Sequence, residues 1–221
     1  MCFSAEVSFG ASVVITTVGI VAYKKAKQKP YRLLALISIF FGIQQFFEGV
    51  VWLATRYDQF SGLLDISTYG YVFFAWVLWP FFIPFVFWKL EKEDIRKKIL
   101  LGITLTGLVM VMVLLYIMVF GNVTAQVLDC SLVYTNSFYN SPGIIASVLY
   151  VLCTAVSNFI SSTGKVWVLG VINVITYFGT QIYFEGRLLS IWCFFAALSS
   201  IVILLIILDL NKKERIEESQ N

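Results

Sequence analysis

The sequence FGIQQFFEG, at residues 41–49, lies inside an apolar run that extends from residue 32 to residue 54. Gln44, Gln45 and Glu48 are polar side chains in a segment that otherwise has the length and composition of a membrane-spanning helix. An ionisable group at such depth costs roughly 2.5–3.5 kcal/mol on insertion scales. Because the residues GVVWLA still follow Glu48 before the run ends, its carboxyl is expected roughly 9 Å inside that end of the helix.

The same pattern returns as FGTQIYFEG at residues 178–186, where six of the nine positions are identical. Two weaker matches flank this pair. ASVV at 11–14 resembles ASVL at 146–149, and FFAW at 73–76 resembles FFAA at 194–197. The chain is therefore predicted to contain two copies of a three-helix unit. An odd number of helices in each copy, joined by a single helix, gives both copies the same orientation, which is a parallel repeat about the membrane normal.

The whole chain has the composition of a membrane protein. Of its 221 residues, 59% are hydrophobic and only 13% are charged, which is more apolar surface than a soluble domain of this size can bury. The first apolar run lacks a basic region before it and a small-residue cleavage site after it, so we interpret it as a retained span. We expect an all-α polytopic fold with seven transmembrane helices in a 3+1+3 order, near residues 7–23, 32–54, 67–89, 97–119, 142–160, 166–184 and 188–209.

These spans predict a single membrane domain over residues 1–221. The segment at 120–141 is polar and rich in turn-forming residues, and we expect an ordered outer loop or lid there. The predicted parts are a first three-helix repeat at 4–96, a linker helix at 97–119, the outer loop at 120–141, a second three-helix repeat at 142–212 and a cytoplasmic tail at 213–221.

Basic residues predict the orientation. Fourteen of the sixteen lysines and arginines fall in alternate connections, after the first, third, fifth and seventh spans, whereas the other connections hold only Arg56 and Arg187. This asymmetry places the N-terminus outside and the C-terminus in the cytoplasm. The net charge of +3 thus reflects topology and contact with anionic lipid, and no nucleic-acid partner is expected.

Gln44 and Glu48 are four residues apart, so they share one face of a helix. By the repeat, Gln181 and Glu185 form a second such stripe, and two-fold pseudo-symmetry would bring both stripes to a common axis. We predict a central site for a solute or a coupled proton there, with Gln45 adding a polar group on one side only. In the competing structural interpretation, these side chains tie helices together through hydrogen bonds.

A few other residues are secondary candidates. Asn158 and Asn173 suit either helix–helix hydrogen bonding or the site, while Trp76 lies in an aromatic third span that suits packing or a binding platform. Arg187 neighbours Glu185 at the predicted water boundary. Outer aromatic residues such as Tyr71, Tyr134 and Trp52 fit an interfacial belt.

The four cysteines divide by predicted side. Cys2 and Cys130 fall on the outer face, where they could pair as a disulfide, whereas Cys153 and Cys193 lie within spans as small apolar residues. If the initiator methionine is removed, Cys2 would also present an amine and a thiol, which makes it a weak catalytic candidate. The chain has no histidine, so neither a metal site nor a cofactor is expected.

The start MCFSA, followed by Gln44, Gln45, Glu48, Gly49 and Trp52 in the pattern QQ-x-x-EG-x-x-W, resembles a family of uncharacterised bacterial multi-pass membrane proteins. That resemblance implies the bacterial inner membrane and no particular activity. The 3+1+3 plan is similar to that of SWEET, PQ-loop and nicotinamide-riboside transporters, and WVLGVINVIT at 167–176 looks like a sixth-span stretch of the last group. No Pro-Gln pair occurs in any predicted span, unlike in standard PQ-loop proteins.

We therefore expect a small-solute transporter or carrier with a Gln/Glu-lined site between the two repeats. Two alternatives use the same features. A seven-helix sensor or receptor would bind a ligand in this outward-facing pocket without moving it, and a membrane enzyme would act on a lipid-like substrate through Cys2 or Glu48. The lipid bilayer and an unidentified solute are the expected partners, and self-association into a homo-oligomer is a further option.

Overall fold

The computed structural model describes residues 4–128, 131–138, 143–183 and 188–220. Helices dominate this part of the chain, and five of them are long and apolar enough to cross a membrane, which fits a membrane protein. Cys2, Cys130, Glu185 and Arg187 lie outside the described residues, so the predictions made for them stay predictions. The five helices are Ala5–Lys25, Lys29–Arg56, Asp58–Leu90, Asp94–Phe120 and Ser190–Ile216.

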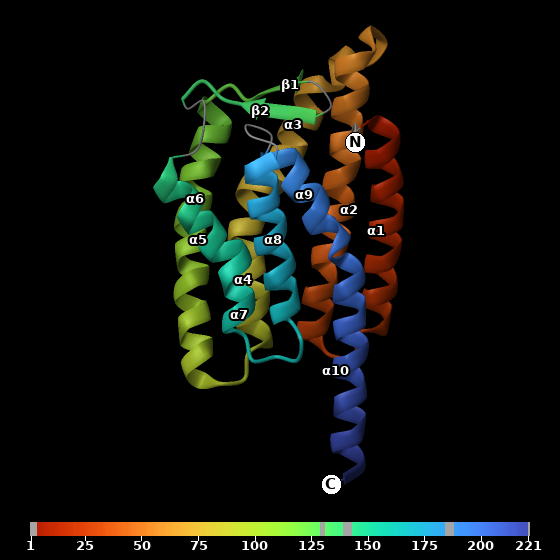
Figure 1. Ribbon diagram of the computed structural model, residues 1–221, viewed down its shortest axis with the longest axis vertical. Coiled ribbons are helices and arrows are strands. Elements are labelled where there is room, and N and C mark those ends of the chain that lie inside the picture. Colours follow the sequence, from red (N-terminus) through yellow and green to blue (C-terminus); the bar gives the residue numbers. More distant parts are fainter. Residues whose placement is uncertain (1–3, 129–130, 139–142, 184–187, 221) are drawn as a thin grey trace.

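The helices run up and down in one bundle (Figure 1). The first two are α1 (Ala5–Lys25) and α2 (Lys29–Arg56). The third segment contains a 3₁₀-helix (Asp58–Leu63), α3 (Leu64–Val72), a π-helix (Phe73–Leu78) and α4 (Trp79–Leu90). After α5 (Asp94–Phe120), the fifth segment contains α6 (Ile144–Val151), a second π-helix (Leu152–Val156) and α7 (Ser157–Ile160). The last are α8 (Trp167–Tyr183), α9 (Leu188–Leu198) and α10 (Ser200–Gln220).

Small residues hold α1 against α2. The buried face of α1 carries Ser8, Ser12 and Gly19 at intervals of about one or two turns, so the two backbones can approach closely. The Ser12 hydroxyl donates a 2.7 Å hydrogen bond to the Gly42 carbonyl. A Cβ at Gly42 would lie only 2.0 Å from Thr16 Oγ1, so this position has no room for a side chain. Gly42 of FGIQQFFEG therefore faces α1, while Gln44 and Glu48 are buried in the bundle.

Two prolines shape α4. Pro84 has no N–H to donate to the Pro80 carbonyl one turn earlier, so that carbonyl lacks its helical partner. The Pro80 oxygen instead faces α5, where a Cβ on Gly107 would lie 2.1 Å from it. The π-helix at Phe73–Leu78 precedes these prolines, and π-bulges often occur at functional sites. The third segment is thus irregular where it packs into the centre of the bundle.

A β-hairpin covers one end of the bundle (Figure 1). Its strands, β1 (Thr124–Leu128) and β2 (Ser131–Thr135), pair antiparallel with Thr124 opposite Thr135. This is the segment for which an outer loop or lid was predicted, and the hairpin adds a small sheet to the otherwise helical fold. The described start of α1 lies at this end, and α10 extends beyond the bundle at the opposite end (Figure 1).

Candidate functional site

The three polar side chains of residues 41–49 on α2 are buried inside the bundle. Gln44 and Gln45 are fully buried and Glu48 is 1% exposed. The Ser190 hydroxyl of α9 donates a short hydrogen bond to Glu48 Oε1, while Glu48 Oε2 has no hydrogen-bond partner. Gln45 lies beside the Glu48 carboxyl, yet neither of its amide atoms makes a hydrogen bond of regular geometry. Buried polar groups are normally paired, so this set is under-satisfied.

Gln44 is oriented by Trp79 of α4. The indole Nε1–H donates a 2.7 Å hydrogen bond to Gln44 Oε1, and an indole can only donate, so the amide oxygen must face it. The Trp79 ring also stacks on Phe41 at a centroid distance of 4.0 Å. The amide nitrogen then lies beside the Cys193 thiol of α9. The first Gln/Glu stripe thus meets α4 on one side and α9 on the other.

Two tyrosines join the hairpin to this polar set. Tyr71 of α3 and Tyr134 of β2 stack almost parallel, with ring centroids 4.6 Å apart. Tyr71 is fully buried, and both tyrosines lie near Glu48 and Cys193. The assignment of these tyrosines to an interfacial belt is therefore wrong for Tyr71, because the hairpin packs over it and removes it from the surface. The hairpin closes the Glu48 end of the bundle through these side chains.

Two small cavities lie along the boundary between the first and the last helices. The first has a volume of about 20 Å³, enough for about one water molecule. Its walls come from α2 and α4 on one side and, on the other, from α6, the π-helix at Leu152–Val156, α8 and α9. The lining residues are Phe41, Trp79, Ile83, Tyr150, Thr154, Asn173, Trp192 and Cys193. The second, of about 10 Å³, shares Phe41, Ile83 and Asn173 with the first and extends to Asn158. Each of these two cavities therefore has room for no more than about one water molecule.

Gln181 does not join the buried set. It lies exposed on α8, whereas its neighbour Thr180 is 2% exposed. The prediction that Gln181 faces the same centre as Gln44 is therefore wrong in this conformation. The physical reason is that α8 packs through a different face, since Gly179 has open space beside it where Gly42 contacts α1. Ser190 and Cys193 of α9 occupy the place expected for the second stripe.

The secondary candidates divide between structure and site. The Asn158 amide donates two 2.9 Å hydrogen bonds to carbonyls of its own helical segment, as expected for a structural role. Asn173 lines both cavities, and its Oδ1 has no partner although the residue is only 9% exposed. Its backbone carbonyl accepts a 3.2 Å hydrogen bond from the Trp192 indole. Trp76 is half-buried and packs against the Tyr71 cluster.

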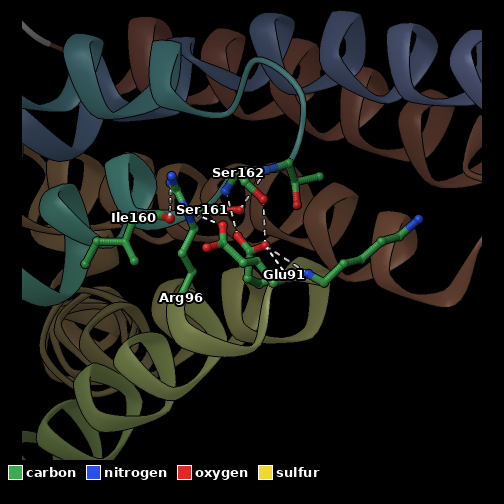
Figure 2. Close-up of polar contacts among 8 residues, drawn as sticks. Glu91, Arg96, Ile160, Ser161 and Ser162 are labelled. Carbon is green, nitrogen blue, oxygen red and sulfur yellow. Dashed lines mark hydrogen bonds and ion pairs between the residues drawn. The ribbon is translucent and has the colours of Figure 1, made fainter.

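A second buried glutamate lies at the opposite end of the bundle. Glu91, in the turn between α4 and α5, is 2% exposed and accepts hydrogen bonds from Ser162 in the turn between α7 and α8. Both Ser162 donors, the amide and the hydroxyl, lie 2.6 Å from the carboxylate (Figure 2). The backbone amides of Lys92 and Glu93 each add a 2.9 Å bond. We call this contact between the two turns the Glu91 clasp.

The hydrogen bonds outweigh burial in setting the charge of Glu91. Burial alone would raise the pKa of its carboxyl, but the Ser162 side chain and three backbone amides, of Glu93, Ser162 and Lys92, stabilise the charged form. The net effect is a pKa below the ordinary value of 4.5. Arg96 extends the clasp, donating 3.1 Å to the Ile160 carbonyl (Figure 2) and pairing with Glu93 at 2.6 Å.

Similar side-chain contacts tie α10 to the turn between α1 and α2. The Tyr31 hydroxyl and the Gln28 amide both donate to Glu214. Asn211 donates a 2.8 Å hydrogen bond to the Lys25 carbonyl and accepts one from the Lys27 amide. Side-chain contacts therefore link the helices at two places at the end of the bundle that holds most basic residues.

Several of these residues carried no sequence signal. Ser190 is a lone serine in an apolar segment, and Glu91 sits in a charged run that looks solvent-exposed. Cys193 was expected to be a small buried apolar residue, which its 4% exposure bears out, but its polar neighbours were not foreseen. Within the described ranges, no three acidic, cysteine or histidine side chains come together as a metal site would require.

Comparisons with known proteins identify a family but no characterised relative. No curated protein and no solved structure is significantly similar to this chain. One family model matches residues 1–218, almost the whole sequence, and it describes a family of unknown function. The suspected resemblance to an uncharacterised family is in agreement with that match. The chain belongs to DUF6629, a family of unknown function.

Proposed function

We propose that this protein is a carrier that moves a small polar solute across the bacterial inner membrane, with its site at Glu48. The observation that carries the proposal is a glutamate 1% exposed, with an unpartnered oxygen, deep within a chain that has several membrane-length helices. Polar groups at depth in a membrane are costly and mark solute or proton pathways. A purely structural glutamate would have its acceptors filled, as Glu91 has.

The position of the site supports transport in particular. Glu48 lies on α2, Ser190 and Cys193 lie on α9, and the two cavities follow the boundary between residues 4–96 and residues 142–212. In the proposed 3+1+3 repeat these ranges are the two three-helix units. Carriers built from such repeats bind their solute at the repeat interface and rock one unit against the other.

Closures at both ends fit an occluded state of such a carrier. The hairpin covers Glu48 through the Tyr71–Tyr134 stack, and the Glu91 clasp joins α4–α5 to α7–α8 at the other end. Fourteen basic residues belong to the clasp end by sequence, so we place that end in the cytoplasm and the N-terminus outside. The hairpin is then the outer gate and the Glu91 clasp is part of the inner gate.

The irregular helices supply places where the units could bend. One π-helix (Phe73–Leu78) lies in the third segment and the other (Leu152–Val156) in the fifth. Just before the second, Tyr150 donates a 2.5 Å hydrogen bond to the Ala75 carbonyl inside the first. This bond couples the bending points of the two proposed units across their boundary.

Cys193 allows a test that does not depend on knowing the solute. We would replace the other three cysteines (C2S, C130S and C153A) and expose right-side-out and inside-out vesicles to a membrane-impermeant methanethiosulfonate. A carrier that alternates its access should allow labelling of Cys193 from both sides. The matched control keeps Cys153, which is fully buried against α5, and replaces Cys193 (C193A), and it should stay unlabelled.

Labelling of Cys193 from neither side would contradict the proposal. Labelling only from outside would contradict it as well and would favour the sensor, since a receptor needs to open its pocket to one side only. Glu91→Ala, which removes the carboxylate of the proposed inner gate, should raise the rate of labelling from the cytoplasmic side alone.

A further inference from the structure

Among the described residues, the groups around Glu48 provide no positive charge. Polar or titratable groups interact with it from α9, α2, α3 and the hairpin, namely Ser190, Gln45, Tyr71, Tyr134 and Cys193, and none of these is basic. Every lysine and arginine in the described ranges is at least partly exposed. A buried carboxylate without a countercharge is strongly unfavourable. With none of the described lysines and arginines buried beside Glu48, we expect the closed site to hold a proton or another cation.

Unpartnered polar atoms of both kinds lie in this set. The amide nitrogens of Gln44 and Gln45 lack an acceptor, and the unpartnered oxygens indicate what a bound cation must offer. Glu48 Oε2 and Asn173 Oδ1 both lack a donor, and each residue is at least nine-tenths buried. The Trp192 indole, a donor at this boundary, is already used by the Asn173 backbone carbonyl. A ligand with several N–H groups would satisfy these oxygens, whereas an anion would meet a carboxylate.

Aromatic rings line the first cavity, whose wall includes Cys193. Phe41 and Trp79 form its wall on the first-unit side, stacked at 4.0 Å. Tyr150 and Trp192 form the wall on the second-unit side, edge to face at 5.7 Å. Ring faces attract organic cations, and a desolvated contact of this kind is worth about 2 kcal/mol. Cys193 lies both on this cavity and beside the polar set, so it links the two.

We propose that the solute is a small organic cation with N–H donors, of the ammonium or guanidinium class, and that it binds at the site in exchange for a proton on Glu48. This inference rests on the proposed carrier site. In the closed, empty form Glu48 Oε2 keeps a proton, and the carboxyl is neutral. When the cation binds between the carboxyl and the aromatic walls, that proton leaves to water, so the charge of the site is unchanged. Export of the cation is then coupled to proton entry.

Guanidinium and urea provide a matched pair of probes. They have the same planar shape and N–H donors, but only guanidinium is charged. We would titrate each into the purified full chain in weakly buffered detergent, with sodium chloride balancing ionic strength, and record bound probe by calorimetry and released protons with a pH indicator. We expect saturable guanidinium binding with proton release, and urea binding at least tenfold weaker, which corresponds to about 1.4 kcal/mol or more.

Three variants test which residues are responsible for guanidinium binding and proton release. Glu48→Gln, which keeps the shape of the side chain, should weaken guanidinium binding at least tenfold and abolish proton release, and Asn173→Ala should weaken binding without abolishing release. Gln181→Ala, on the exposed face of α8, should change neither. Retained helical circular dichroism in each variant verifies that the protein is folded.

Equal binding of urea and guanidinium, undiminished binding to Glu48→Gln, or no saturable binding by the wild type would each overturn the inference. These outcomes are separable from failure of the carrier proposal. Guanidinium binding with proton release, but with Cys193 labelled from one side only, would retain the cation site and reject transport. Labelling of Cys193 from both sides, without preferential binding of guanidinium over urea, would instead retain transport and reject the cation site.

Discussion

Glu48 and Glu91 are both nearly inaccessible to solvent, at 1% and 2% exposed, but they differ in what surrounds them. Glu91 accepts four hydrogen bonds, three of them from backbone amides, and its pKa is lowered because these donors outweigh burial. Glu48 accepts one bond from Ser190 and leaves its second oxygen unpaired. Burial alone therefore does not distinguish a structural carboxylate from a functional one. The degree to which protein donors satisfy its acceptors does, because an unsatisfied buried group costs free energy that a ligand, a proton or a bound water must recover.

The surroundings explain this difference. Glu91 lies where two turns meet, and turns supply free N–H groups that have no helical partner. Glu48 lies in the middle of α2, where every neighbouring amide is used within a helix, so only side chains can serve it. A carboxylate placed there lowers the stability of the folded protein, and for this reason we assign Glu48 to the site and Glu91 to the gate.

The largest effect is expected at the clasp. Glu91→Ala leaves four donors between the two turns without their acceptor, which should lower the free energy of unfolding by about 3 kcal/mol. Titration of the purified protein with sodium dodecyl sulfate, followed by circular dichroism, measures this loss. Glu93→Ala is the matched control, because its exposed pair with Arg96 should contribute less than about 1 kcal/mol. Equal losses in both variants would show that Glu91 is no more than a surface charge.

Two serines test the comparison directly, since each donates its hydroxyl to one of the two glutamates. Ser190→Ala removes the donor to Glu48 Oε1, and we expect a loss of about 1.5 kcal/mol in the same titration. Ser162→Ala should cost about 0.5–1 kcal/mol, because Glu91 keeps its three backbone donors. A larger loss in Ser162→Ala than in Ser190→Ala would contradict the difference drawn between the two sites.

The pH dependence of the clasp is the next smaller effect. The pKa of Glu91 is lower in the folded protein than its ordinary value of 4.5, so its contribution to stability is complete above that value. It is lost as the pH falls from about 4.5 through the folded pKa, because protonation then removes the charged acceptor. The stability difference between the wild type and Glu91→Gln should therefore shrink below pH 4.5, and a constant difference over that range would refute the assignment.

The sequence predicted the first stripe well because its signal is local. Gln44 and Glu48 share a face by helical geometry, and polar groups in an apolar span must turn inward, as both do. The second stripe failed at Gln181, although FGTQIYFEG repeats the same letters. Which face of a helix is buried depends on its packing partners, and α8 turns Thr180 inward instead.

The rest of the site depends on contacts between distant parts of the chain. Ser190 reaches Glu48 across 142 positions, and Ser162 reaches Glu91 across 71. A serine that serves a carboxylate has the same sequence appearance as one that bonds to its own helix, as Ser157 does. Glu91 in the run KLEKEDI looked like a solvated charge because the turn that covers it is remote in sequence. The local sequence pattern locates buried polar groups that cost free energy. Only the tertiary fold shows which hydrogen-bond donors offset that cost.

The smallest effect is expected at the site itself. Glu48→Gln keeps an oxygen to accept from Ser190 and removes the ionisable group, so the unfolding free energy without solute should change by less than about 1 kcal/mol. The same titration with sodium dodecyl sulfate measures it, beside Glu91→Gln as the matched change at the clasp. A loss at Glu48 as large as that at Glu91 would mean that the Glu48 carboxylate, too, holds the fold together. A small loss combined with abolished guanidinium binding would instead separate the two glutamates by role, because a residue kept for its ligand contributes little to the empty protein.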